Sequence, residues 1–211
     1  MPALRPEPKA SCSRCPRLVA FRRSNKKAYP AYFNGASPSF GQEDAHALIV
    51  GLAPGLHGAN KTGRPFTGDA SGEMLYSCLA ELGLTRGTFE NDPKDGFDLD
   101  GIMITNAVRC VPPENKPTGA EVNNCRPYLA DRIKALPNLK TLFALGRVAH
   151  DATIRTLGLR LAEYPFSHQA VYRLPGGLKL IDSYHCSRYN VNTGRLTREM
   201  FLAALGELKK A

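Results

Sequence analysis

Apolar residues gather in four short runs that alternate with longer segments of helical periodicity. The runs cover residues 45–50, 101–105, 141–145 and 178–182, and each is typical of a buried strand. Apolar side chains at helical spacing predict helices over about 69–83, 118–136 and 146–157, and a last one around 201–208. Strands that alternate with helices predict an α/β fold, a three-layer α/β/α sandwich around a central, mainly parallel four-stranded sheet.

The length of 211 residues fits a single domain, residues 1–211, that can bury a sizeable core. Residues 1–44 lack such apolar runs and predict an irregular, basic N-terminal arm. No apolar run approaches the ~20 residues that span a bilayer, and residues 1–6 lack the apolar region of a secretory signal. We therefore expect a cytoplasmic protein without a membrane partner, in which the six cysteines are not paired as disulfides.

The balance of charge bears on the kind of partner. There are 28 Lys and Arg against 19 Asp and Glu, a formal net charge of +9. Such an excess favours a polyanion, because neutralising phosphates releases counterions. A solvated basic surface without a partner has the same composition, so charge alone favours nucleic acid only slightly.

Three candidate motifs follow predicted strands directly. A Gly-rich loop begins at Gly51, Asn106 follows the second strand, and another loop carries His185. In parallel sheets, ligand sites lie beyond the carboxyl ends of the strands. We therefore expect these three segments to converge on one site.

Four cysteines have a spacing that suits a metal centre. Cys12 and Cys15 form a C-x2-C pair, and Cys110 and Cys125 form a wider one. Four thiolates can hold a structural zinc or an iron–sulfur cluster. Zinc sites usually use two tight pairs, so the wide spacing weakly favours the cluster. Cys125 also falls on an apolar helical stripe, where a buried core cysteine is the alternative.

These segments together resemble one family. Gly51-Leu-Ala-Pro-Gly, followed by Gly-Arg-Pro-Phe-Thr-Gly-Asp at 63–69, resembles the first motif of the uracil-DNA glycosylase superfamily. Residues 105–113, Thr-Asn-Ala-Val-Arg-Cys-Val-Pro-Pro, resemble the segment that supplies a base-recognition Asn and the third cluster Cys in its iron–sulfur branch. Residues 183–190 resemble the loop with its His-Pro-Ser motif after the fourth strand. Gly-Leu-Ala-Pro with His57 is most similar to the fifth family, the B-type enzymes, because the fourth would place an acidic residue at Leu52.

The resemblance implies a DNA-repair glycosylase that hydrolyses the N-glycosidic bond of uracil, and also of other deaminated bases such as hypoxanthine, leaving an abasic site. It implies a [4Fe–4S] cluster on Cys12, Cys15, Cys110 and Cys125. The implied catalytic residues are Asp69, His185 and Asn106. The implied substrate-binding residues are Gly51, Ala53, His57, Phe66, Asn106, Arg188 and Asn190.

Each role has a structural alternative. Asp69 can orient water or stabilise a sugar cation, but it can equally cap the helix that follows. Asn106 can close a turn, and Phe66 can anchor a loop. Two positions depart from the pattern: Ala53 stands where the first family has a water-positioning Asp, and Cys186 stands where the His loop usually has Pro. We expect Cys186 to line the site.

The expected partner is DNA that contains deaminated bases, bound by a monomer associated with a bacterial or archaeal nucleoid. Arg188 and Tyr189 suit a phosphate contact and filling of the vacated stack. Two other classes stay open. One is a DNA-binding protein of this fold without turnover, including one that captures the abasic sugar covalently through His. The other is a zinc-stabilised nucleotide-binding module.

Overall fold

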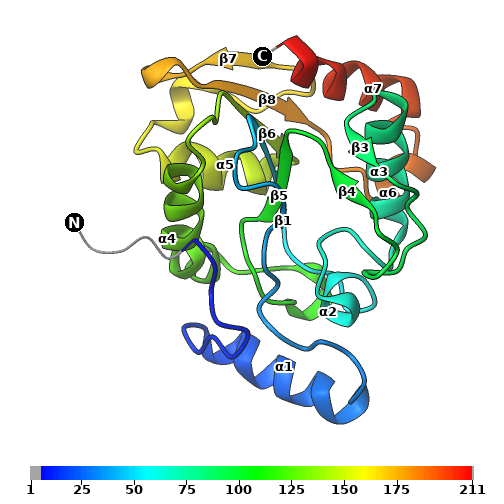
Figure 1. Cartoon of the computed structure of the whole chain (residues 1–211). Helices are drawn as coiled ribbons and strands as arrows, with labels where there is room; N and C mark the ends of the chain where they lie inside the picture. Colours follow the sequence, from blue (N-terminus) through cyan, green and yellow to red (C-terminus); the bar gives the residue numbers. More distant parts are fainter. Residues whose placement is uncertain (1–5, 211) are drawn as a thin grey trace.

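The computed structural model describes residues 6–210, which form one central sheet between layers of helices (Figure 1). The sheet has six strands in the order β1-β5-β2-β6-β8-β7. Their bounds are β1 Phe40–Gly41, β2 Ala47–Gly51, β5 Ile102–Asn106, β6 Thr141–Leu145, β7 Val171–Arg173 and β8 Lys179–Ser183. β5, β2, β6 and β8 are parallel, whereas β1 and β7 pair antiparallel at the two edges. A separate antiparallel pair joins β3 Thr85–Arg86 to β4 Asp98–Leu99.

The four parallel strands are the four predicted, and the sheet is larger than predicted by its two edge strands. Every residue of β2, β5 and β6 is buried, as expected for parallel strands covered on both faces. β1 has only two residues, and β7 alternates between exposed and half-buried side chains. Neither edge strand therefore leaves an apolar run in the sequence.

Helices cover the two faces of the sheet. One face packs against α3 Ala70–Glu81 and α7 Arg198–Gly206, and the other against α4 Gly119–Ala135 and α5 Arg147–Thr156. Neighbouring residues of β2 divide between the layers, since Ile49 packs in the first core and Leu48 in the second. The predicted three-layer sandwich is confirmed. Shorter elements are α2 Ala59–Thr62, α6 Arg188–Asn192, and 3₁₀ segments at Pro113–Asn115, Leu161–Glu163, Pro175–Gly177 and Glu207–Lys210.

Side-chain caps stand at the starts of α3 and α4. The Asp69 carboxylate accepts a hydrogen bond from the Gly72 N–H at 3.1 Å at the start of α3. Thr118 and Glu121 form a reciprocal capping box at the start of α4. These caps fix where both helices begin relative to the preceding loops.

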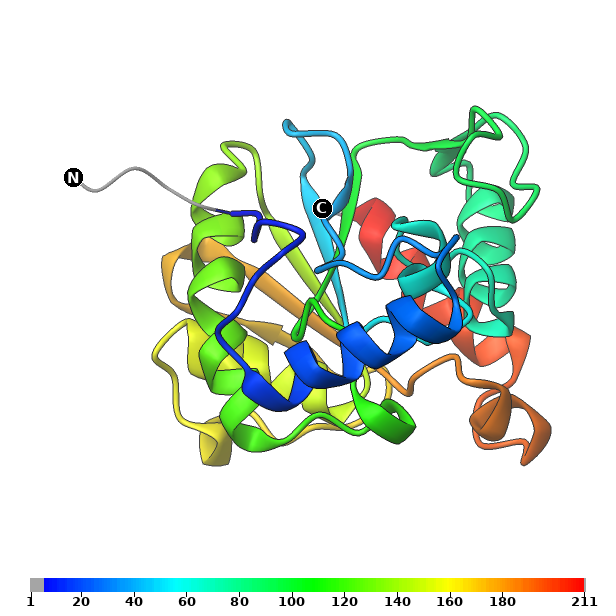
Figure 2. The ribbon, with the colours of Figure 1, turned by 90° about the horizontal axis from the view of Figure 1, so that it is seen from below.

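The predicted irregular arm contains a helix, α1 Pro16–Ala28, so that prediction is wrong for this stretch. Only three of its residues face inward, namely Leu18, Arg22 and Asn25, and this leaves no apolar stripe for the sequence to reveal. α1 lies at one end of the molecule, where Arg17 donates hydrogen bonds to Glu121 at the start of α4 (Figures 1 and 2). Residues 1–5 of the arm lie outside the described residues. No helix between residues 6 and 210 is long and apolar enough to cross a membrane.

Candidate active site

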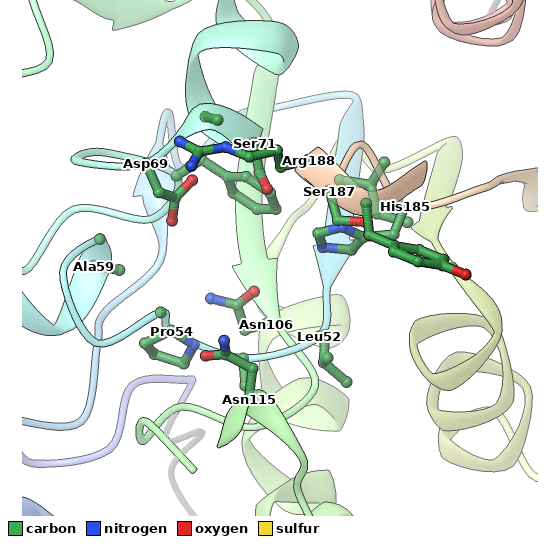
Figure 3. A pocket seen from close by; sticks show the side chains of 18 of the residues that line it. Leu52, Pro54, Ala59, Asp69, Ser71, Asn106, Asn115, His185, Ser187 and Arg188 are labelled. Carbon is green, nitrogen blue, oxygen red and sulfur yellow. The ribbon is translucent and has the colours of Figure 1, made fainter. Parts of the chain in front are cut away.

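A cavity of about 690 Å³ opens beyond the carboxyl ends of β2, β5, β6 and β8 (Figure 3). Its lining residues are 52–59, Phe66, 69–71, Asn106, Asn115, 145–148, His185 and 187–189. The three segments that follow strands in the sequence all contribute to its walls. This volume is within the usual range for small-molecule sites, about 300–1,000 Å³.

Asn106 and Phe66 approach each other over a glycine. Asn106 ends β5, is only 4% exposed, and pairs in register with Gly51 at the end of β2. A Cβ atom at Gly51 would lie 2.9 Å from Phe66 Cζ and would contact Asn106 Oδ1. The absence of a side chain at Gly51 therefore lets the amide and the ring lie together at the base of the cavity. Gly51 itself is buried and does not line the cavity, although it was predicted to bind the substrate.

His185 is the second residue after β8, and its ring packs against Phe66 at 6.2 Å between centroids. Burial lowers the pKa of His185 to about 4, because the surroundings penalise the charged form. The imidazole is therefore neutral near pH 7. Asn190 donates a hydrogen bond to the His185 carbonyl oxygen at 2.8 Å, so it supports this loop and does not line the cavity.

Asp69 combines two contacts. Its Oδ1 caps α3, as the structural alternative predicted. Its Oδ2 faces the 55–58 loop, and a Cβ atom at Gly55 would lie 3.2 Å from this oxygen. A Cβ at Gly58 would collide with the same oxygen. The cap thus leaves one carboxylate oxygen beside the cavity, toward which the side chain points in Figure 3.

The rim of the cavity includes His57 on one side and α6 on the other. His57 is exposed, and its Nδ1 lies 3.0 Å from the Tyr32 hydroxyl. Ala53 lines the wall without any polar side-chain atom. Arg188 and Tyr189 belong to α6, in the orange segment that projects from the body of the molecule (Figure 2). Tyr189 is 72% exposed.

Asn115 also lines the cavity, and sequence reasoning missed it. Figure 3 shows its amide below that of Asn106, and both side chains extend toward the same space. Asn115 and Glu114 both have a positive φ, at 56° and 54°. Asn tolerates this left-handed backbone better than most residues, which is the one signal that the sequence offered here.

The four cysteines predicted as ligands lie together, since Cys12, Cys15, Cys110 and Cys125 line one small cavity beside α1. Cys125 lies on the buried face of α4 and packs with the other cysteines of this group. Between residues 6 and 210, no group of three or more His, Cys, Asp or Glu side chains is arranged so that it could hold a metal ion.

Several donors face these sulfur atoms. The Arg109 backbone N–H donates to Cys125 Sγ at 3.3 Å, and the Arg22 guanidinium donates to Cys110 Sγ at 3.4 Å. The Asn124 amide lies 3.7 Å from the Sγ of Cys15.

The other two cysteines belong to the core. Cys78 and Cys186 are both fully buried in the cluster beneath α3 and α7. The Cys186 thiol donates to the Ser71 carbonyl oxygen at 3.4 Å. Cys186 does not line the cavity, so the prediction that it lines the site is wrong.

The fold and these motifs correspond to a known family of DNA-repair proteins. Residues 38–209 match the family model of the Uracil DNA glycosylase superfamily, and the chain belongs to this superfamily. The resemblance inferred from the motifs is thereby confirmed.

Relatives of two types within the superfamily match most of the chain. A type-5 uracil-DNA glycosylase from Thermus thermophilus is 48% identical over 205 residues, 95% of this chain and 93% of the relative. A type-5 enzyme from Pyrobaculum aerophilum is 40% identical and covers 92% and 86% of the two chains. A type-4 uracil-DNA glycosylase from P. aerophilum is 33% identical over 71% of this chain and 63% of its own. The higher identity with type-5 enzymes agrees with the expected fifth-family resemblance.

Proposed function

We propose that this protein hydrolyses the N-glycosidic bond of uracil and of hypoxanthine in DNA, and leaves an abasic site. The observation that carries the proposal is the meeting of a carboxylate, an amide and a neutral imidazole around one cavity, at Asp69, Asn106 and His185. The uracil-DNA glycosylase relatives support the activity on uracil.

The first step is recognition of an extruded base. The target bond lies inside a stacked duplex, so the nucleotide must flip out at a cost of a few kcal/mol, least for a mispaired base. Phe66 offers a ring on which the base stacks, and the Asn106 amide offers both a donor and an acceptor to its edge.

The second step is cleavage, which leaves negative charge on the base and positive character on the sugar. The neutral His185 imidazole donates a hydrogen bond to a base oxygen and so stabilises the departing anion. The Asp69 oxygen that is not used in the helix cap orients the attacking water or stabilises the sugar cation.

A broad substrate range follows from the wall of the cavity. Ala53 and Leu52 supply no polar side-chain group to select one base. Apolar walls discriminate weakly, often by only ~10–200-fold, whereas specific hydrogen bonds reject analogues strongly. Selection then depends on Asn106 and on how easily a base flips, so wobble-paired hypoxanthine is accepted and correctly paired cytosine is refused.

The DNA contacts and the setting complete the proposal. Arg188 contacts phosphate and Tyr189 fills the space that the flipped base leaves. We place the protein in the cytoplasm, associated with the nucleoid, and acting as a monomer on DNA that contains deaminated bases.

The four cysteines of the small cavity fit a [4Fe–4S] cluster in their chemistry. Burial raises the pKa of Cys110 to about 12 and that of Cys125 to about 11, so a cationic centre is needed to ionise them. The donors to Cys15, Cys110 and Cys125 suit thiolate sulfurs. A bound cluster would supply a cross-link between the arm, at Cys12 and Cys15, and the segments after β5 and on α4. We therefore assign it a structural role.

The test measures release of free base from duplexes with a single uracil or hypoxanthine opposite each normal base. We expect wild-type turnover on both bases, and much slower release by Asp69→Asn and His185→Ala, each with unchanged folding and iron content. Asp44→Asn is the matched control, because Asp44 is exposed and does not line the cavity.

Three results would contradict parts of this assignment. Binding without free base would favour a non-turnover protein, including one that captures the abasic sugar. Strict confinement to uracil would refute the broad pocket. Unchanged rates in both variants would refute the catalytic roles of Asp69 and His185.

A further inference from the structure

A second histidine, His168, lies behind the loop that carries His185 and takes no part in the mechanism above. Its Nδ1 accepts a hydrogen bond from the Tyr184 backbone N–H at 3.2 Å. Its ring stacks on the Tyr184 ring, with 4.9 Å between centroids and 10° between planes. His168 does not line the active-site cavity.

We infer that His168 is a positioning residue, which acts through Tyr184 to hold the His185 imidazole in place; this inference rests on the proposed function. The contacts along the loop carry it. The last strand residue, Ser183, accepts from the Gly146 N–H at 2.8 Å. The hydrogen bond from Tyr184 to His168 comes next, and the His185 carbonyl then accepts from Asn190. The backbone is thus held on both sides of the His185 side chain, by His168 at the Tyr184 N–H and by Asn190 at the His185 carbonyl.

The side chain of Tyr184 is held as well as its backbone. Its ring packs against His168, against Phe166 at 6.1 Å between centroids, and under the Arg195 guanidinium at 4.7 Å. Because Tyr184 and His185 are consecutive, a rotation that moved the imidazole would also have to move this packed ring. The contact with His168 is the one in this group that restrains both the ring and the amide.

The protonation state of His168 fits this role. Nδ1 can accept only if the ring is neutral with its proton on Nε2. Burial lowers the pKa of His168, which favours the neutral ring. Nε2 is buried and has no hydrogen-bond partner within residues 6–210. A buried N–H without a partner lowers the stability of the fold. An apolar ring could stack on Tyr184 without this loss of stability, so packing alone does not explain a histidine here.

Two substitutions separate the hydrogen bond from the stacking. His168→Phe keeps a flat ring but has no acceptor for the Tyr184 N–H. His168→Asn loses the ring but places an amide oxygen near the position of Nδ1. His46→Phe is the control, because His46 is another half-buried histidine that does not line the active-site cavity.

We expect His168→Phe to slow single-turnover release of uracil by ~10–100-fold, as a misplacement near 1 Å does in other sites. Affinity for a duplex with an abasic-site analogue should be unchanged, because His168 does not line the active-site cavity. His168→Asn should recover most of the rate. Amide hydrogen exchange at Tyr184, followed by NMR, should be at least ~10-fold faster in His168→Phe than in the wild type, since its acceptor is lost.

The outcomes are separable. An active wild type with an equally fast His168→Phe variant would overturn the positioning role. Equal losses in both variants, together with equally lowered thermal midpoints, would show simple packing and also overturn it. A wild type that releases no base would refute the proposed function instead. The rate of amide hydrogen exchange at Tyr184 would then test the inference, and an unchanged rate in His168→Phe would overturn it.

Discussion

Gly51→Ala tests whether the close approach of Asn106 and Phe66 matters for excision. The new Cβ would lie 2.9 Å and 3.0 Å from two ring carbons of Phe66, and closer still to Asn106 Oδ1. Carbon atoms pack best at about 3.5–4.0 Å, so the ring must retreat by about 0.6 Å or more. Overpacking of this kind costs about 1–3 kcal/mol of unfolding free energy. A shift near 1 Å at a site can cost ~100-fold in rate, so we expect a loss of ~10–100-fold.

The assay is single-turnover release of uracil from a labelled duplex, beside thermal unfolding of the same preparations. Gly119→Ala is the matched control, because a Cβ there meets nothing within 4 Å. It should keep the wild-type rate. A Gly51→Ala enzyme that excises uracil as fast as the control would refute the idea that this glycine sets the geometry of the base site.

The remaining predictions concern His185, the cysteines and DNA binding. The His185 ring should titrate near pH 4 by NMR. The unfolding free energy should fall as the pH drops from about 6.5 to about 4, because only the unfolded chain takes up the proton in that window. A titration midpoint near 6.5 would show that burial does not lower the pKa of this imidazole. Cys12→Ala should lower the iron content of anaerobically purified protein, whereas Cys78→Ala should leave it unchanged. A wild-type protein that contains zinc and no iron would refute the cluster assignment. The affinity for DNA should fall steeply as the salt concentration rises. Arg188→Ala should weaken binding to duplex DNA more than binding to single strands. Equal losses of affinity for the two substrates would indicate a simple phosphate contact.

The sequence predicted those parts of the fold that depend on local periodicity. Four central strands and four helices stand out because burial on both faces, or along one helical stripe, leaves an apolar pattern. α1 left no such pattern, since Arg22 and Asn25 supply two of its three buried side chains. The edge strands were missed for a related reason: a strand as short as Phe40–Gly41 depends on its neighbour β5 and not on its own residues.

The site was predictable where a residue follows a strand, and less so elsewhere. Asn106 and His185 lie at strand ends, where topology alone brings them together. Asn115 reaches the cavity through two consecutive left-handed residues, a path that no periodicity reveals. Cys186 was assigned to the site because it follows His185, but its thiol turns toward Ser71 in the core. Proximity in sequence did not fix the direction of the side chain.

The double use of Asp69 limits how this position can change. One oxygen secures the first turn of α3, and the other lies at the cavity. Replacement by Ala would remove both contacts, so a loss of rate would be mixed with a loss of fold. Asn retains an oxygen for the Gly72 N–H, but it removes the charge and places an NH2 group where the second oxygen stood. In a library of single substitutions at position 69 that is selected for stability alone, the retained residues should therefore be mainly Asn, Ser and Thr, which can also cap a helix.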